Sequence, residues 1–263
     1  MDLQLENRIA LVTAASQGLG YATALQLARE GALVAICSRD EARVNAATDS
    51  IRVETGRSVL GITGDVSRAE DVEHIVERVV DEYGGLDILV TNAGGPPSAA
   101  FEEVTDEMWQ EAFNLNLMSA VRLIRKALPH LRSSTAPAVL TITSYSVKQP
   151  IPNLVLSNSI RMAVIGLTKT LALELGREGI RFNSILPGWT ETERVQDLME
   201  ARAQRNNTSV EEEIAKQAAD SPFGRMATPQ EFANVATFLC SPAASYVTGV
   251  MLPVDGGFYK GTL

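Results

Sequence analysis

Residues 8–20 read Arg8-Ile-Ala-Leu-Val-Thr13-Ala-Ala-Ser-Gln-Gly18-Leu-Gly20, an apolar run that leads directly into a turn containing two glycines. The run is typical of a strand buried on both faces, and residues 18–30 have the pattern of a helix. Such a turn presents backbone amides and the positive end of a helix dipole, which together bind a pyrophosphate. The same glycines also fit a tight strand-to-helix turn that binds nothing.

The rest of the chain repeats this alternation of strand and helix. Strands are predicted at Arg8–Thr13, Leu33–Ser38, Ser58–Thr63, Leu86–Thr91, Ala138–Thr143, Ile180–Leu186 and Val250–Val254. Helices are predicted at Gly18–Glu30, Glu41–Thr55, Arg68–Tyr83, Asp106–Leu131, Leu154–Arg177 and Pro229–Cys240. This order predicts an α/β fold of the Rossmann type, a doubly wound seven-stranded parallel sheet with helices on both faces. No linker or repeat divides the chain, so residues 1–263 are expected to form one domain.

Charge and composition limit the classes of partner. The formal net charge is −9, which disfavours binding to the phosphate backbone of nucleic acids. No apolar run reaches the length of about 18 residues that spans a membrane, and the amino terminus has no leader pattern. We therefore expect a cytoplasmic protein that acts on a small molecule. Cys37 and Cys240 lie outside any metal-ligand spacing and are expected to be buried free thiols, so no metal site is predicted.

Residues 190–225 form a charged, helix-prone segment between the sixth strand and the last helix. Loops at this end of a parallel sheet line the ligand crevice, so the segment is a candidate substrate lid. Its arginines Arg194, Arg202 and Arg205 are suited to an acidic substrate. Because they alternate with acidic residues, a solvated helix face is the competing interpretation.

Further motifs follow the other strands in order, and the whole set resembles the short-chain dehydrogenase/reductase family. The motifs are Thr13–Gly20 with Ala14 in place of the family's first glycine, Gly64-Asp65-Val66, Thr91-Asn92-Ala93-Gly94, Pro187-Gly188 with Thr190 and Thr192, and Asp255-Gly256-Gly257. The resemblance covers almost the whole chain. It implies a nicotinamide dinucleotide cofactor and, commonly, a homotetramer or dimer built through the helices at 106–131 and 154–177.

The resemblance also identifies the residues expected to bind the cofactor. They are Thr13, Ser16, Gln17, Gly18, Leu19, Gly20, Ser38, Arg39, Asp65, Val66, Asn92, Ala93, Gly94, Arg161, Pro187, Gly188, Thr190 and Thr192. At the end of the second strand an acid binds the ribose 2′-hydroxyl of NAD, whereas a cation accepts the 2′-phosphate of NADP. Arg39 follows Ser38 there, so NADP(H) is favoured over NAD(H), although Asp40 and Glu41 lie next to it.

The catalytic set of the family is only partly present. Asn116 and Ser144 match its asparagine and serine, which implies that Ser144 polarises a carbonyl and Asn116 supports a proton-relay water. The expected tyrosine and lysine are replaced by Ser157, thirteen residues after Ser144, and by Arg161. An aliphatic hydroxyl is a far poorer acid than a phenol. Arg161 cannot exchange a proton, but it can bind the nicotinamide ribose and fix a positive charge.

Tyr145 is a candidate replacement for the missing phenol, because it directly follows Ser144. A tyrosine that only packs in the protein is the alternative. The sequence thus predicts an NADP-dependent oxidoreductase for a carbonyl or alcohol substrate, similar to 3-oxoacyl-thioester reductases, with an atypical proton donor. A catalytically silent NADP-binding protein with a regulatory or assembly role is the other hypothesis.

Overall fold

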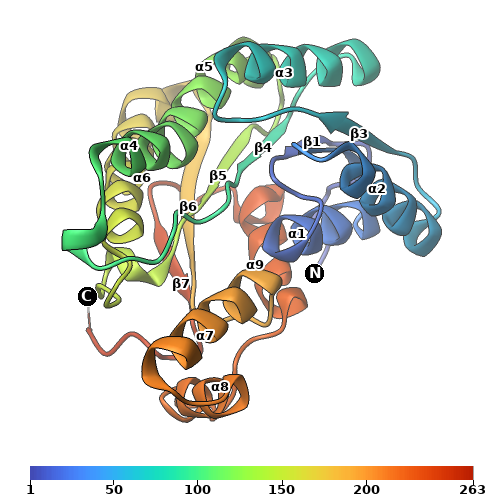
Figure 1. The fold of residues 1–263 in the computed structure, drawn as a ribbon. Coiled ribbons are helices and arrows are strands. Elements are labelled where there is room, and N and C mark those ends of the chain that lie inside the picture. Colours follow the sequence, from blue (N-terminus) through green and yellow to red (C-terminus); the bar gives the residue numbers. More distant parts are fainter. Residues whose placement is uncertain (263) are drawn as a thin grey trace.

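The computed structural model describes residues 1–262 and contains one seven-stranded parallel sheet (Figure 1). The strands are β1 (Ile9–Val12), β2 (Leu33–Ser38), β3 (Val59–Thr63), β4 (Ile88–Thr91), β5 (Ala138–Ile142), β6 (Arg181–Pro187) and β7 (Met251–Val254). Their order in the sheet is β3-β2-β1-β4-β5-β6-β7. The winding direction changes between β1 and β4, and ligands of such sheets bind at this point, outside the carboxyl ends of the strands. The predicted fold class is confirmed.

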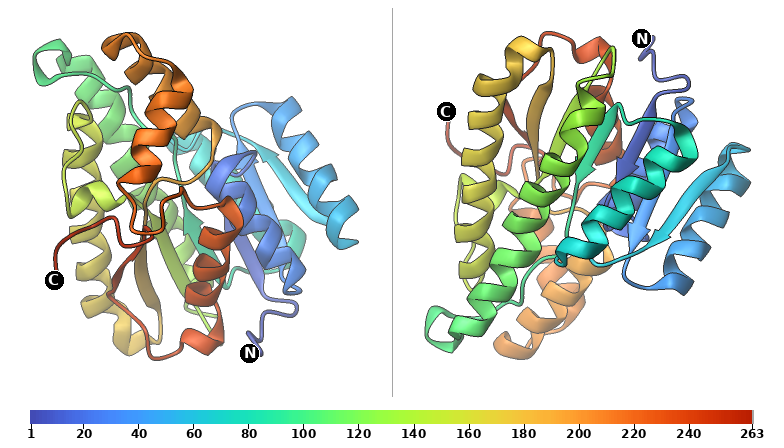
Figure 2. Two further views of the ribbon diagram at one scale, coloured as in Figure 1. Left: turned by 90° about the horizontal axis from the view of Figure 1, so that it is seen from below. Right: turned by 90° about the horizontal axis from the view of Figure 1, so that it is seen from above.

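Helices cover both faces of the sheet (Figure 2). They are α1 (Gly18–Arg29), α2 (Glu41–Thr55), α3 (Ala69–Tyr83), α4 (Asp106–Ala112), α5 (Ser119–Leu131), α6 (Val155–Leu175), α7 (Glu193–Asn206), α8 (Val210–Ala219) and α9 (Pro229–Cys240). Helices α1, α2 and α9 pack on one face, and α3, α5 and α6 pack on the other.

Alternation along each strand divides the core between these two faces. In β1, Ala10 and Val12 belong to the cluster under α1, α2 and α9, whereas Leu11 belongs to the cluster under α3, α5 and α6. Phe232 fills the first cluster and Phe182 the second, and both side chains are fully buried. The strand sequences are apolar throughout because each strand is covered on both sides.

The predicted helix at 106–131 needs a correction, because it is not α-helical throughout. Residues Phe113–Met118 form a π-helical segment, labelled η2, between α4 and α5. An extra residue in a helical turn rotates the following side chains, and such segments are frequent at functional sites. Asn116 lies in η2 and is buried. The helical periodicity of the sequence carries no signal for this local change.

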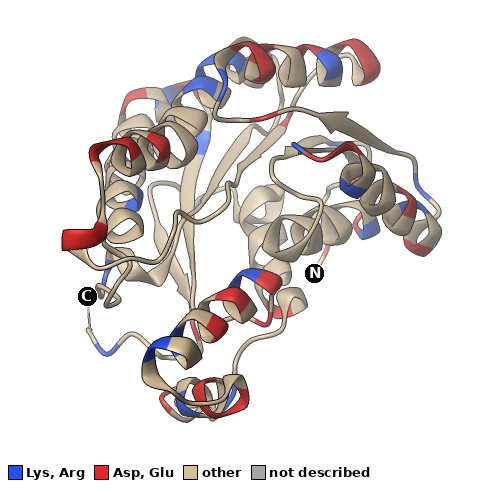
Figure 3. Cartoon of the chain, in the orientation of Figure 1, with Lys and Arg blue, Asp and Glu red and all other residues tan. Residues whose placement is uncertain are grey.

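The candidate lid at 190–225 contains two helices, α7 and α8, that pack against each other. Thr192 caps α7 by accepting a hydrogen bond from the Val195 amide, and Ser209 caps α8 through a capping box with Glu212. Basic and acidic residues are interspersed along both helices (Figure 3). Motion of this segment is not tested by the structure and stays a prediction.

The two cysteines are buried and unpaired, as predicted. Burial raises the pKa of both Cys37 and Cys240 to about 12, so neither thiol ionises at neutral pH. In residues 1–262, none of the helices combines the length and the apolar character needed to cross a lipid bilayer.

Candidate active site

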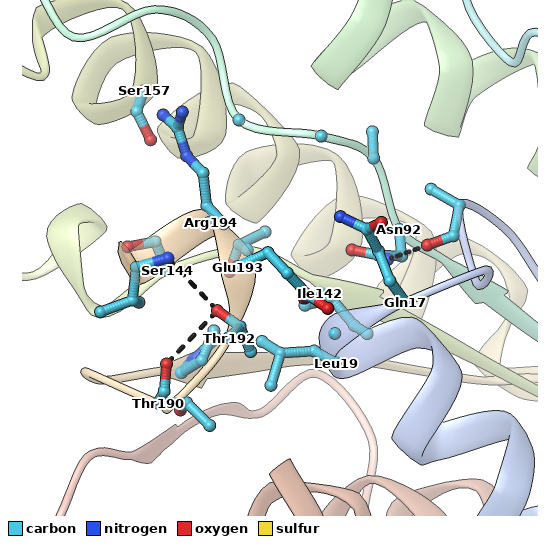
Figure 4. Close-up of a pocket in the computed structure, with 18 of the residues that line it drawn as sticks. Gln17, Leu19, Asn92, Ile142, Ser144, Ser157, Thr190, Thr192, Glu193 and Arg194 are labelled. Atoms are coloured by element: carbon cyan, nitrogen blue, oxygen red, sulfur yellow. Dashed lines mark hydrogen bonds between the residues drawn. The ribbon is translucent and has the colours of Figure 1, made fainter. Parts of the chain in front are cut away.

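A cavity of about 500 Å³ lies at the carboxyl ends of the strands, where the winding direction of the sheet changes. Most of the predicted site residues line it (Figure 4). From the predicted cofactor set these are Ser16, Gln17, Gly18, Leu19, Ser38, Arg39, Asp65, Val66, Asn92, Ala93, Gly94, Arg161, Pro187, Gly188, Thr190 and Thr192. From the predicted catalytic set they are Ser144, Tyr145, Ser157 and Arg161.

Three predicted residues lie behind the cavity wall and support it. The Thr13 hydroxyl donates to the Asn92 carbonyl at 2.7 Å and accepts from the Asn92 amide at 2.9 Å, which ties the ends of β1 and β4 together. A Cβ atom on Gly20 would lie 2.7 Å from the Ala14 carbonyl oxygen, so a side chain does not fit there. Asn116 donates from Nδ2 to the Gly94 carbonyl at 2.9 Å. Its buried Oδ1 has no hydrogen-bond partner within residues 1–262.

The turn before α1 leaves the backbone amides at the start of the helix without a side-chain cap. Gln17 occupies the N-cap position of α1 but its side chain makes no capping hydrogen bond. Gly18 has a φ of +61°, which an L side chain rarely adopts. Ala14, at the family's first glycine, also has a positive φ of +47°. The uncapped helix end therefore fits an anion, and Ala14 holds a strained conformation in order to form it.

The end of β2 carries two basic side chains beside the cavity. Arg39 is exposed and its Nη1 lies 3.8 Å from an oxygen of Asp65. Arg43, in the first turn of α2, donates from Nη1 to Oε1 of Gln17 at 3.1 Å and also lines the cavity. Sequence reasoning missed Arg43. Helical side chains lean toward the N-terminus of their helix, so a basic residue in the first helical turn after β2 can reach the end of that strand. The position of Arg43 was therefore the signal in the sequence.

Arg161 and Ser157 lie together on one face of α6, deep in the cavity. Arg161 donates from Nε to the Ser157 hydroxyl at 3.2 Å and from Nη1 to the carbonyls of Ile142 and Thr143, both at 3.2 Å. Both side chains are buried. Burial, and then the positive charge of Arg194, lowers the pKa of Arg161 to about 10, so its guanidinium remains charged at neutral pH. Its Nη2 has no hydrogen-bond partner in the described part of the chain.

The hydroxyls of Ser144 and Ser157 are both held as acceptors by N–H groups. Ser144 accepts from the Ser146 amide at 3.1 Å, and Ser157 accepts from Arg161. A hydroxyl has one hydrogen and two lone pairs, so each of these hydrogens remains available to a ligand oxygen. The pair forms a site that can donate two hydrogen bonds.

Tyr145 is turned toward an aromatic cluster. Its hydroxyl accepts a hydrogen bond from Nε1 of Trp189 at 2.9 Å, and its ring packs edge-on against Trp189 and Phe258. The side chain is 4% exposed. Burial raises its pKa to about 12, which makes it a weaker acid than an ordinary phenol. These contacts favour the interpretation of Tyr145 as a packing residue.

Helix α7 contributes side chains whose role the sequence left open. Arg194 donates from Nη2 to the Pro96 carbonyl at 2.6 Å and lies against Gly95. Arg202 stacks on the Trp189 ring, with its Cζ 4.6 Å from the ring centroid, and donates to Gln217. Arg205 is exposed. The three arginines of α7 therefore differ: one enters the cavity, one holds α7 against Trp189, and one faces solvent.

Comparison with known proteins gives the family. A family model described as enoyl-(acyl carrier protein) reductase matches residues 13–259. The chain is 35% identical over 254 residues to dehydrogenase/reductase SDR family member 4 of Oryctolagus cuniculus, covering 96% of this chain and 94% of that protein. The chain belongs to the short-chain dehydrogenase/reductase family. It is an oxidoreductase, and the resemblance found in its motifs is confirmed.

Other relatives of this dehydrogenase/reductase are reductases as well. A putative ketoacyl reductase of Streptomyces coelicolor is 34% identical and covers 96% of this chain and 97% of its own length. The structure of L-sorbose reductase from Gluconobacter frateurii with NADPH and L-sorbose has a TM-score of 0.94 at 34% identity, covering 99% of this chain and 100% of that chain. A variant of actinorhodin polyketide ketoreductase with NADPH has a TM-score of 0.92 at 33% identity, covering 97% and 98%.

Proposed function

We propose that this dehydrogenase/reductase is an NADP(H)-dependent oxidoreductase for a small carbonyl or alcohol substrate, in which Ser157 and Arg161 replace the family's phenol and lysine and act together with Ser144. The observation that carries the proposal is the Arg161–Ser157 hydrogen bond of 3.2 Å inside the cavity. It places a fixed positive charge beside a hydroxyl whose hydrogen is available to a substrate oxygen.

The residues present fit a dinucleotide. The uncapped amides at the start of α1 suit the pyrophosphate, and Gly20 leaves no side chain to obstruct the turn. Asp65 and Val66 line the part of the cavity that we assign to the adenosine, while Asn92, Thr190 and Arg161 line the part that we assign to the nicotinamide. NADP(H), when bound, supplies or accepts the hydride.

Arg39 and Arg43 support the choice of NADP(H). Both line the same end of the cavity as Ser38, and β2 ends there without an acid that would bind a ribose 2′-hydroxyl. Substitution of either arginine by alanine is expected to weaken NADPH binding about tenfold and to leave NADH binding unchanged. Titration of each variant with the two nucleotides, followed by nucleotide fluorescence, measures this difference. Equal losses for both nucleotides would contradict the assignment.

The two serines act on the substrate oxygen. Each donates one hydrogen bond, and the Arg161 charge stabilises negative charge that develops on that oxygen. The proton then comes from solvent through the hydroxyls rather than from a phenol. The unpartnered Oδ1 of Asn116 supports the relay water that the family resemblance implies, because a buried acceptor of this kind suits an ordered water.

A screen of NADPH oxidation at 340 nm tests the function against ketones, quinones and 3-oxoacyl thioesters. We expect turnover with at least one class, and a loss of about 10²-fold in kcat when Ser157 is replaced by alanine. Tight NADPH binding without turnover on any class would favour the catalytically silent alternative.

We further propose that the protein is a cytoplasmic homotetramer or dimer that associates through α6 and the helices on either side of η2. Leu173 and Met162 on α6 are 74% and 48% exposed in the single chain, and Phe113 is partly exposed beside α4. Such apolar side chains are typical of an interface. Light scattering in solution measures the assembly, and a monomeric mass at micromolar concentration would refute it.

A further inference from the structure

A second guanidinium in the cavity, that of the half-buried Arg194, has no role in the site proposed above. It extends from α7 across the cavity toward Ser157 (Figure 4). Its Nη2 is fixed by the Pro96 carbonyl at 2.6 Å. A Cβ atom on Gly95 would lie 2.8 Å from its Nε, so the guanidinium rests directly on the glycine backbone. Helix α7 is held in turn by buried Met199 and by the stacking of Arg202 on Trp189.

No carboxylate forms an ion pair in this part of the cavity, although Asp197 is among the residues that line it. Within residues 1–262, neither Arg161 nor Arg194 has an acidic oxygen within 4.0 Å. Asp197, on the same helix as Arg194, lies beyond that distance, and its charge offsets only part of the burial that lowers the pKa of Arg194. Burial lowers the pKa of Arg194, and the proximity of the two charges disfavours the charged form of Arg161. Cations removed from water normally have an anionic partner, and since neither guanidinium of this cavity forms an ion pair, the partner is expected to come from a ligand.

The pyrophosphate of the cofactor does not fit that role. A Cβ atom on Gly18 would lie 3.7 Å from Thr192 Cγ2 and 3.9 Å from Glu193 Oε2, so these two residues of the α7 entry face the phosphate-binding turn. Arg194 follows Glu193 by about 100° around the helix and faces Gly95 and Pro96 instead. Its unpaired N–H groups therefore face the side of the cavity that contains Ser157.

We propose that Arg194 is a specificity residue that binds a carboxylate of the substrate, so that the enzyme acts on a short oxo acid or the corresponding hydroxy acid. This inference rests on the proposed function, because it takes the carbonyl to lie at Ser144 and Ser157. The carboxylate lies toward α7, where a guanidinium provides two parallel N–H donors. Neutral carbonyl compounds of the same size leave Arg194 without an anionic partner in the cavity.

Binding to the NADP⁺ complex tests the inference without relying on turnover. The probes are pyruvate and acetoacetate, each compared with its methyl ester, and the dissociation constants are measured by saturation-transfer NMR. For the wild-type protein we expect at least one acid to bind ten to a hundred times more tightly than its ester. Arg194→Gln is expected to reduce this ratio to about one, while NADP⁺ affinity stays within about threefold.

Two further variants separate the role of Arg194 from a general effect of charge. Arg205→Gln removes the same charge from an exposed position on α7 and should leave the ratio unchanged. Gly95→Ala keeps the charge of Arg194 but displaces its guanidinium. The φ of Gly95 is not in the left-handed region, so we expect this variant to fold and to lose the preference for acids. Equal binding of acids and esters, absence of acid binding, or a preference that survives Arg194→Gln would overturn the inference. Failure to bind NADP⁺ would instead overturn the proposed function.

Discussion

A comparison of two buried arginines, Arg161 and Arg181, tests directly whether Arg161 acts in the active site or stabilises the fold. Arg181 donates to four backbone carbonyls at and beyond the end of α9, namely those of Leu239, Cys240, Ser241 and Ala244. Arg161 makes three hydrogen bonds of 3.2 Å and leaves Nη2 free. The lowering of the Arg161 pKa from 12.5 to about 10 corresponds to about 3 kcal/mol against its charged form.

This comparison predicts a small change in stability for one methionine substitution and a large loss for the other. In Arg161→Met, about 3 kcal/mol from three lost hydrogen bonds is offset by relief of the buried charge, so the free energy of unfolding should change by less than about 1 kcal/mol. In Arg181→Met, the four lost hydrogen bonds are worth about 4 kcal/mol and relief of the buried charge offsets only part of that, so stability should fall by about 3 kcal/mol. Loss of the fixed charge in Arg161→Met should also reduce kcat by at least 10²-fold.

Urea denaturation of the apo proteins at one fixed protein concentration measures both values, and NADPH titration of each variant follows. A loss of 3 kcal/mol or more for Arg161→Met, equal to that of Arg181→Met, would show that Arg161 is a structural residue. The reasoning about the site would then be wrong.

Three other results are expected. Ala14→Gly should raise the free energy of unfolding by about 0.5–1 kcal/mol in urea melts, because it relieves an alanine held in the left-handed region. This gain exceeds the cost of the greater entropy that glycine gives to the unfolded chain. Lower stability of the variant would show that Ala14 is unstrained. Tyr145→Phe should keep kcat within about threefold and lose about 1 kcal/mol of stability with the Trp189 hydrogen bond, whereas a tenfold fall in kcat would make Tyr145 the proton donor. The pKa of Arg161 is lowered only to about 10 and that of Tyr145 is raised to about 12, so both side chains stay protonated below pH 9. We therefore expect kcat/KM to be constant from pH 6 to 9. A change in kcat/KM near pH 7 would indicate that another group titrates.

The features that depend on local sequence pattern could be predicted from the sequence. Strand runs and the turn at Gly18 predicted the sheet and the position of the cavity, because burial on both faces and turn geometry leave clear signals in the residues. The π-helical segment around Asn116 left no such signal, since it replaces one helical hydrogen-bond pattern with another. The different roles of Arg194 and Arg205 depend on how α7 packs over Gly95, and charge pattern alone cannot distinguish two arginines on one helix.

The central claim is that Ser157, fixed beside Arg161, donates a hydrogen bond to the substrate oxygen in place of a phenol. Its most direct measurement is the steady-state rate of NADPH oxidation by Ser157→Ala, with the best substrate from the screen and with NADPH affinity measured on the same sample. We predict a fall in kcat of about 10²-fold with an NADPH dissociation constant within about threefold of the wild-type value. An unchanged kcat would contradict the claim.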